Sequence, residues 1–195
     1  TPPAPIPAEQ STEENRFRDM EGFVWAQEAV SALTEAGVIA GVSAAEFAPG
    51  REIKREEFIK MAVCAFGMEN PNADSPFEDV MQADWFYPYV SAAYEKGITH
   101  GHGTRFGTGE KITRQDVAVL ICRFLELEGT VIPLVETEFA DNEEIADYAK
   151  ASVAYLSGRG ILSGVGENRF APQASATRAE TAKILYEALT LTKNY

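Results

Sequence analysis

The sequence predicts an all-α fold made of three helix–loop–helix repeats. A short charged motif recurs as IKREE at 53–57, ITRQD at 112–116 and ATRAE at 176–180. Its arginines, Arg55, Arg114 and Arg178, are spaced by 59 and 64 positions, which indicates a threefold internal repeat. Each motif follows a glycine-containing loop and opens an amphipathic run. One such unit exposes an apolar face that it cannot bury alone, so we expect a single domain with pseudo-threefold symmetry.

The first helix of each repeat follows an F-x-D or F-x-D-like segment and ends at a glycine. In repeat 1 the apolar stripe runs from Trp25 to Ala36, and Gly37 is expected to end the helix in a left-handed conformation. The same pattern returns in repeat 2 from Trp85 to Gly97 and in repeat 3 from Tyr148 to Gly160. Pro88 lies near the start of its helix, where proline is best tolerated.

The second helix of each repeat begins at the charged motif and has apolar residues at i, i+3, i+4, i+7 and i+8. These positions are Phe58, Met61, Ala62, Ala65 and Phe66 in repeat 1, Val117, Leu120, Ile121, Phe124 and Leu125 in repeat 2, and Thr181, Ile184, Leu185, Ala188 and Leu189 in repeat 3.

The domain organisation follows from these repeats. We expect a proline-rich linker at 1–16, then repeats at 17–76, 77–138 and 139–195 that form one compact, monomeric domain. The linker would join a covalently attached upstream domain, the alternative being a frayed terminus.

Composition excludes several classes of protein. The 195 residues are 45% hydrophobic, enough for one ordinary core, and the net charge of −13 argues against a nucleic-acid partner. No apolar run is long enough for membrane insertion. Cys64 and Cys122 fall on apolar-patterned helices and are interpreted as buried thiols, with a bridge between them left open.

The charged motif contains more than a helix cap requires. Thr113 with Asp116, and Thr177 with Glu180, form capping boxes or come close to one. An arginine in the first turn opposes the helix dipole, so its recurrence suggests pairing with an anion. The alternative is a salt bridge to the aspartates of the segments before the first helices, which we otherwise interpret as helix caps or turn formers: Asp19, Asp79 and Asp141.

Loop glycines are the next candidates. Gly101 and Gly103 in repeat 2, and Gly164 and Gly166 in repeat 3, allow the backbone to turn or to approach a ligand closely. Repeat 1 departs from the pattern with Ser43 in its loop. It also has Lys54 at the position where the other repeats have a capping threonine, which adds a charge beside Arg55.

No metal, cofactor or catalytic group is predicted. His100 and His102 flank Gly101 without nearby Cys or His partners, so we expect them to be exposed to solvent. No EF-hand loop is present, and nothing converges into a nucleophile–base pair or another catalytic set. We therefore expect a protein that is not an enzyme.

These residues resemble the S-layer homology family. The resemblance rests on F-x-D, the aromatic-led helix ending in glycine, G-x-x-x-x-x-F-x-P and the ITRAE-like motif, in three copies over about 17–191. It implies a three-pronged spindle around a central three-helix bundle. It also implies noncovalent anchoring of an extracellular protein to the bacterial cell wall or S-layer. The implied partner is an acidic, pyruvylated secondary cell-wall polysaccharide, bound in grooves between repeats.

The resemblance also implies ligand contacts for individual residues. The motif arginines would face the carboxylate, and Trp25 and Trp85, for which a core position is the default, would stack on sugar. Two hypotheses of other classes remain open: a structural or protein–protein adaptor without glycan binding, and a glycan-active enzyme.

Overall fold

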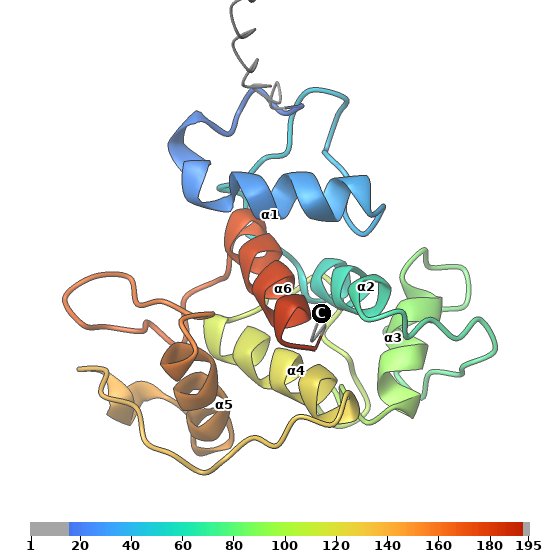
Figure 1. The fold of residues 1–195 in the computed structure, drawn as a ribbon. Coiled ribbons are helices and arrows are strands. Elements are labelled where there is room, and N and C mark those ends of the chain that lie inside the picture. The colour runs from blue at the N-terminus through green and yellow to red at the C-terminus, as the bar shows by residue number, and fades with distance from the viewer. Residues whose placement is uncertain (1–15, 193–195) are drawn as a thin grey trace, which may run out of the picture.

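The computed structural model describes residues 16–192, and this part of the chain is all-helical, as predicted. Between residues 16 and 192 there are isolated β-bridges but no β-strand. The predicted linker lies outside the described residues, except for Arg16. The helices, shown in Figure 1, are η1 (Glu21–Phe23), α1 (Val24–Glu35), α2 (Arg55–Ala65), α3 (Tyr87–Glu95), α4 (Arg114–Leu127), η2 (Asn142–Glu144), α5 (Asp147–Gly158) and α6 (Arg178–Thr192).

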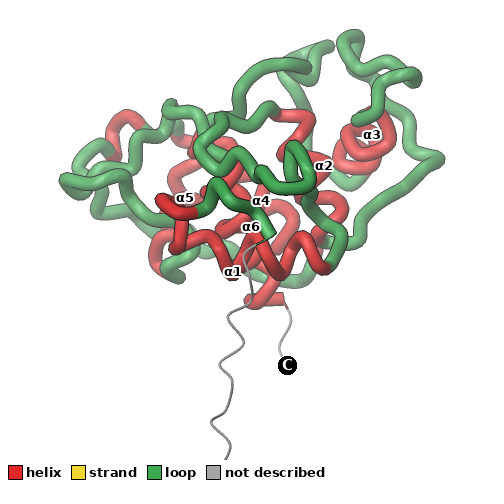
Figure 2. Tube along the Cα trace, turned by 90° about the horizontal axis from the view of Figure 1, so that it is seen from above, coloured by secondary structure: helices red, strands yellow, loops and turns green. Residues whose placement is uncertain are grey.

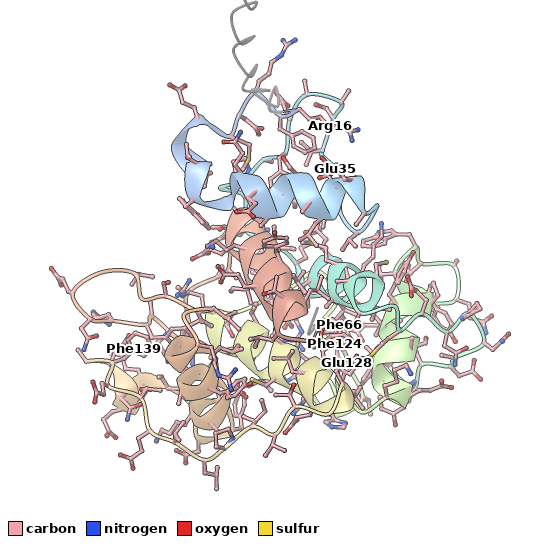
Figure 3. All side chains as sticks on the ribbon, in the orientation of Figure 1. Arg16, Glu35, Phe66, Phe124, Glu128 and Phe139 are labelled. Carbon is pink, nitrogen blue, oxygen red and sulfur yellow. The ribbon has the colours of Figure 1, made fainter. Side chains whose placement is uncertain are left out.

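Three central helices, one from each repeat, form the core of the molecule. Helix α6 packs against both α2 and α4, and all three contribute buried apolar side chains to the core. In Figure 2, α4 and α6 lie between the outer helices α5 and α3. Phe66, directly after α2, stacks on Phe124 of α4 with ring centroids 4.9 Å apart (Figure 3). The expected central bundle is confirmed.

Each outer helix packs on the central helix of the preceding repeat. Helix α3 packs on α2, α5 on α4, and α1 on α6, which brings the first and last helices of the chain together (Figure 1). The apolar face of each outer helix, such as Val90 and Ala93 of α3, is therefore buried between repeats. The repeats are interleaved in a ring, and the prongs of the molecule each combine two repeats.

A ring of three backbone hydrogen bonds closes the centre. The amide of Ile53 donates to the carbonyl of Ala176 (3.0 Å), that of Ala176 to Ile112 (3.0 Å), and that of Ile112 to Ile53 (3.1 Å). All three residues are buried. Because a buried amide without a partner is costly, each repeat depends on the other two for this bond.

Local signals set the helix ends as predicted. Gly37, Gly97 and Gly160 have φ of +72°, +71° and +72°, the left-handed conformation expected just beyond a helix. Pro88 lies in the first turn of α3.

Both Cys64 and Cys122 are free thiols, and burial raises the pKa of Cys122 to about 12. The disulfide alternative is therefore wrong.

Candidate functional site: three pockets between repeats

The motif arginines connect each repeat to the next. The guanidinium Nε of each donates to the carbonyl of a buried phenylalanine and lies over that ring. The pairs are Arg55 with Phe106 (3.1 Å), Arg114 with Phe170 (2.9 Å) and Arg178 with Phe47 (2.9 Å). The guanidinium carbons lie 5.3, 5.0 and 4.5 Å from the ring centroids, within cation–π range.

These arginines are almost completely buried, with exposed fractions of 7%, 6% and 7% in chain order. Burial lowers the pKa of Arg114 and Arg178, while nearby carboxylates act in the opposite direction. An arginine remains charged under such conditions. The motif arginine is thus first a structural connection, and only part of its guanidinium faces outward.

The carboxylate partners of the arginines are not the predicted ones. Arg55 pairs with Asp116 (3.1 Å) and Arg114 with Glu180, the acids of the neighbouring repeat's motif. In repeat 1, Arg51 instead binds Glu57 (2.7 Å). Among the described residues no motif arginine forms a salt bridge with Asp19, Asp79 or Asp141, so that alternative is wrong. Asp79 and Asp141 pair with arginines of their own loops, and Asp19 and Asp141 act on Arg178 and Arg114 only as more distant charges.

The predicted capping boxes are complete in only one repeat. In repeat 3 the Thr177 hydroxyl accepts the Glu180 amide, and the Glu180 carboxylate accepts the Thr177 amide (2.8 Å). In repeat 2 Thr113 accepts the Asp116 amide (3.2 Å), whereas the Asp116 carboxylate is engaged by Arg55. Lys54 has no acceptor side chain, so in repeat 1 only Glu57 contributes, by accepting the Lys54 amide (2.9 Å).

The aspartates Asp19, Asp79 and Asp141 do not cap the first helices. Their carboxylates accept loop amides in their own repeats: Asp19 those of Phe47 and Ala48, Asp79 those of Phe106, Gly107 and Thr108, and Asp141 those of Phe170 and Ala171. Each therefore holds the phenylalanine whose carbonyl accepts a hydrogen bond from the motif arginine of the preceding repeat. The interpretation as helix caps is corrected, and that as turn formers fits.

The four loop glycines divide into two kinds. A Cβ on Gly101 would lie 2.3 Å from the Arg105 carbonyl oxygen and 2.6 Å from the Phe77 ring, and one on Gly164 would lie 2.7 Å from the Arg169 carbonyl oxygen. Gly103 and Gly166 have open space and positive φ, which serves a turn. Only Gly101 and Gly164 line a pocket.

Three pockets with equivalent linings lie between the repeats. Each combines the post-helix loop and central helix of one repeat with the motif arginine of the preceding repeat and an aromatic of the following one. We name each pocket after the repeat that supplies its loop. The repeat-1, repeat-2 and repeat-3 pockets have cavity volumes of about 250, 220 and 340 Å³.

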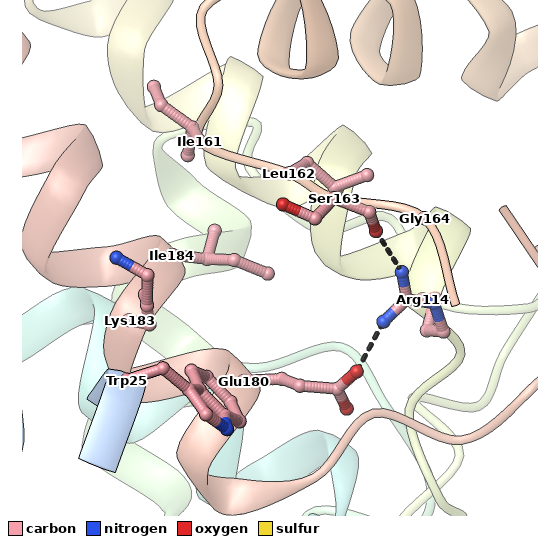
Figure 4. A pocket seen from close by; sticks show the side chains of 9 residues that line it. All are labelled: Trp25, Arg114, Ile161, Leu162, Ser163, Gly164, Glu180, Lys183 and Ile184. Carbon is pink, nitrogen blue, oxygen red and sulfur yellow. Dashed lines mark hydrogen bonds and ion pairs between the residues drawn. The ribbon is translucent and has the colours of Figure 1, made fainter. Parts of the chain in front are cut away.

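The repeat-3 pocket illustrates the arrangement (Figure 4). Trp25 forms one wall, and Lys183 extends from α6 beside Ile184. Arg114 donates to the Ser163 carbonyl (2.6 Å) and pairs with Glu180, as the dashed lines show. One side of the pocket is apolar and the other is charged, which suits a ligand with a ring face and an anionic group.

The aromatic walls are exposed to solvent. Trp85 in the repeat-1 pocket and Trp25 in the repeat-3 pocket are 54% and 48% exposed, and Tyr148 in the repeat-2 pocket is 60% exposed. The default core position is therefore wrong for both tryptophans. Tyr148 differs from them because its hydroxyl donates to Asp116 (2.9 Å) and accepts from Gln115 (3.0 Å).

Cations outnumber carboxylates in every pocket. The repeat-3 pocket contains Arg114 and Lys183 against Glu180, and the repeat-2 pocket Arg55 and Arg123 against Asp116. The repeat-1 pocket contains Arg51, Lys60 and Arg178 against Glu57. Counted over its lining residues, each pocket is positive on a chain of net charge −13, although Lys183 is also paired with Glu187 of α6, which lies outside the lining.

Some lining residues were not predicted from the sequence. Lys60 and Lys183 occupy equivalent positions on α2 and α6, and Lys60 lies over Trp85 with its Nζ 5.7 Å from the ring centroid. Their equal spacing from the motif arginines was the available signal. Lys54, which was predicted to contact a ligand, lines none of these three pockets. No cluster of metal-ligating side chains occurs in residues 16–192.

Comparison with known sequences places these features in a family. The profile of the S-layer homology domain matches three segments, 16–59, 76–118 and 138–182. The Surface-layer 125 kDa protein of Lysinibacillus sphaericus is 30% identical over 183 residues, which is 92% of this chain and 15% of that protein. Amylopullulanase of Thermoanaerobacterium thermosulfurigenes is 30% identical over 85% of this chain and 9% of its own length.

An S-layer protein of Bacillus anthracis is 28% identical over 87% of the chain and 20% of its own length. The chain thus spans a fifth or less of each of these three relatives, two of which are named for the surface layer and one for an enzyme. Among the described helices, none is both long and apolar enough to cross a membrane.

Proposed function

Because the chain belongs to the S-layer homology family, we propose that it anchors a larger protein noncovalently by binding an acidic, pyruvylated cell-wall polysaccharide in the three pockets between its repeats. The family places the chain at the bacterial cell surface, in the cell wall or S-layer. The polysaccharide and its pyruvate group are the part that needs a test.

The observation that carries this proposal is the local positive charge of all three pockets. An acidic chain repels a polyanion at long range, so an anionic polymer must be held by cations that are placed locally. The equivalent positions of Lys60 and Lys183 place an ammonium at the edge of two pockets, beside Trp85 and Trp25 respectively. A sugar ring against the indole and a carboxylate near the ammonium would use both features.

Threefold repetition favours a polymer as the ligand. The pockets are at or below the lower end of the usual range for small-molecule sites, about 300–1,000 Å³, and suit a terminal sugar unit better than a long oligosaccharide. Weak contacts in several pockets gain strength through effective concentration when the chains of the polymer lie close together in the wall.

Cell-wall sacculi provide the test. The chain should sediment with purified sacculi and stay in solution when the secondary polymer has been stripped from them. The double variant Trp25→Ala, Trp85→Ala removes the walls of two pockets at exposed positions and should weaken retention about tenfold or more, since two of three contacts are lost.

The matched control is Val24→Ala, Met81→Ala, which truncates two other exposed apolar side chains near these tryptophans, 68% and 62% exposed, that line none of the pockets. It should be retained like the parent. Equal retention of both double variants would show that the repeat-1 and repeat-3 pockets do not bind the wall and would favour the adaptor hypothesis. Release of sugars from sacculi by the pure chain would instead support the glycan-active enzyme.

A further inference from the structure

The repeat-2 pocket differs from the other two in its titratable groups. His100 and His102 line it, and the equivalent loop positions are Ala40 and Val42 in repeat 1 and Ser163 and Val165 in repeat 3. The chain has two histidines in all, and both are in this one pocket.

The repeat-2 pocket also lacks the lysine. Val119 stands on α4 where α2 has Lys60 and α6 has Lys183, so no ammonium occupies that position. Arg123 of α4 supplies a cation instead, but its Nη1 already donates a hydrogen bond to the Ile98 carbonyl (2.7 Å).

In the described part of the chain, the arginine of this pocket lacks one hydrogen bond that both of its counterparts make, the bond to a carbonyl of the post-helix loop. Arg114 and Arg178 donate Nη2 to the carbonyls of Ser163 (2.6 Å) and Ala40 (2.8 Å). Within residues 16–192, no corresponding hydrogen bond joins Arg55 to the His100 carbonyl. One guanidinium nitrogen of Arg55 is therefore available on the side where the two imidazoles lie.

The charged groups around the imidazoles come from four parts of the chain. Arg55 belongs to α2, Asp116 and Arg123 to α4, and Tyr148 to α5. The fourth part is the loop itself. There the His102 amide donates to the Arg105 carbonyl (2.6 Å), and the Arg105 side chain pairs with Asp79. The Asp116 carboxylate is bound by both Arg55 and Tyr148, so it is not available to neutralise an imidazolium.

From these differences we propose that His100 and His102 make the repeat-2 pocket an acid-strengthened site, whose affinity for a carboxylate-bearing sugar rises as the pH falls from 7.5 to 5.5. The pockets of repeats 1 and 3, which use Lys60 and Lys183, keep a constant affinity over this range. This inference rests on the proposed function, since it concerns the same ligand class.

The direction follows from the charges. Histidine is the side chain whose charge ordinarily changes between about pH 5 and 8, whereas a sugar carboxylate remains ionised and a lysine remains charged over that range. Each imidazolium then adds an attraction of the size seen for exposed ion pairs, so two of them should strengthen binding on the order of three- to tenfold.

The first test uses the methyl glycoside of N-acetylmannosamine carrying a pyruvate ketal, the terminal sugar that the family resemblance implies. Its binding is measured by calorimetry at pH 7.5 and 5.5. Trp25→Ala with Trp85→Ala leaves the repeat-2 pocket as the intact one, and this variant should bind three- to tenfold more tightly at pH 5.5. Adding His100→Ser and His102→Val, the residues of the repeat-3 loop, should make its affinity independent of pH. The inference would be overturned if the double tryptophan variant bound the sugar equally well at both pH values, or if it did not bind the sugar at all.

The second test needs no variant. Since the chain has only two histidines, their imidazole C2 protons give two signals that can be titrated by NMR in the intact protein. If protonation strengthens binding, linkage requires that saturating sugar raises the titration midpoints. Binding with unmoved midpoints would refute the role of the histidines. Failure of the parent protein to bind the sugar at either pH would count against the proposed function itself.

Discussion

At the level of single residues, equivalent positions in the three repeats have unequal bonding. Asp79 accepts three loop amides, whereas Asp19 and Asp141 accept two each. The difference arises at the third loop position, where repeat 2 has Thr108 and the other repeats have Pro49 and Pro172. Proline has no amide hydrogen to donate.

This bonding makes part of the stability depend on pH. Burial raises the pKa of Asp79, but hydrogen bonds from Thr108, Phe106 and Gly107 outweigh it, and the net pKa lies below 3.8. A lowered carboxyl pKa stabilises the fold above the unfolded-state pKa, and this stabilisation is lost as the pH falls through the folded-state value. We therefore expect the free energy of unfolding to fall below about pH 4.

Asp79→Asn should be less stable than the parent at pH 7, because an amide offers one acceptor oxygen to three amides, and should lose less stability on acidification. Urea denaturation at pH 7, 4 and 3 measures both effects. Glu78→Gln, at the exposed neighbouring position, should keep the parent's acid dependence. If Asp79→Asn and the parent lose the same free energy between pH 7 and 3, another group is responsible.

The motif arginines show how far a residue type can be interpreted from sequence. A cation that opposes the helix dipole does have a repeated role, but this role is mainly to join the repeats through a buried phenylalanine carbonyl. Because Arg114 is 6% exposed and holds Phe170, Ser163 and Glu180, its removal would disturb the fold as well as any ligand. The exposed tryptophans are the cleaner variants for testing binding.

At the level of elements, the post-helix loops depend on one glycine more than on the other. Gly101 and Gly103 have nearly the same φ, +61° and +65°, so the conformational cost of a side chain is similar at both. They differ in space, because a Cβ on Gly101 meets the Arg105 carbonyl and the Phe77 ring, while a Cβ on Gly103 meets nothing within 4 Å.

Gly101→Ala should therefore lower the free energy of unfolding by about 1–3 kcal/mol more than Gly103→Ala, as overpacking does in a well-packed site. Chemical denaturation of the two variants side by side removes the shared backbone cost. Equal destabilisation would mean that the loop moves freely away from the Phe77 ring, and the pocket wall it forms would then be adaptable.

Local patterns were enough to predict the helices, their glycine ends and most of their apolar faces, although the aromatics that head the predicted stripes, Trp25, Trp85 and Tyr148, are exposed. They could not show the partner of each face, since a 3.6-residue period identifies a buried stripe without saying what covers it. The contact of α1 with α6 joins the two ends of the described chain. Lys60 and Lys183 were not predicted for a related reason. A lysine on a helix surface is common, and only the structure shows that Trp85 and Trp25 line the same pockets as these lysines.

At the scale of the whole molecule, interleaving makes each repeat depend on the others. The central ring of Ile53, Ile112 and Ala176, the arginine connections and the outer helices all cross between repeats. No repeat can lose its structure without exposing apolar faces and unpaired buried amides in both neighbours. This differs from an open array of repeats, in which folding can begin and end anywhere.

We therefore expect the three repeats to unfold in one cooperative transition. The two tryptophans report on different repeats, Trp25 on repeat 1 and Trp85 on repeat 2, so Trp85→Phe and Trp25→Phe give proteins with a single tryptophan, which can be excited selectively at 295 nm. For each variant, urea unfolding is followed both by tryptophan fluorescence and by circular dichroism. Because the two curves come from the same variant, any change in its stability affects both, and they should coincide if unfolding is two-state. Fluorescence that changes at a lower urea concentration than the helix signal in either protein would show that one repeat unfolds alone. The closed ring would then be weaker than its hydrogen bonds indicate.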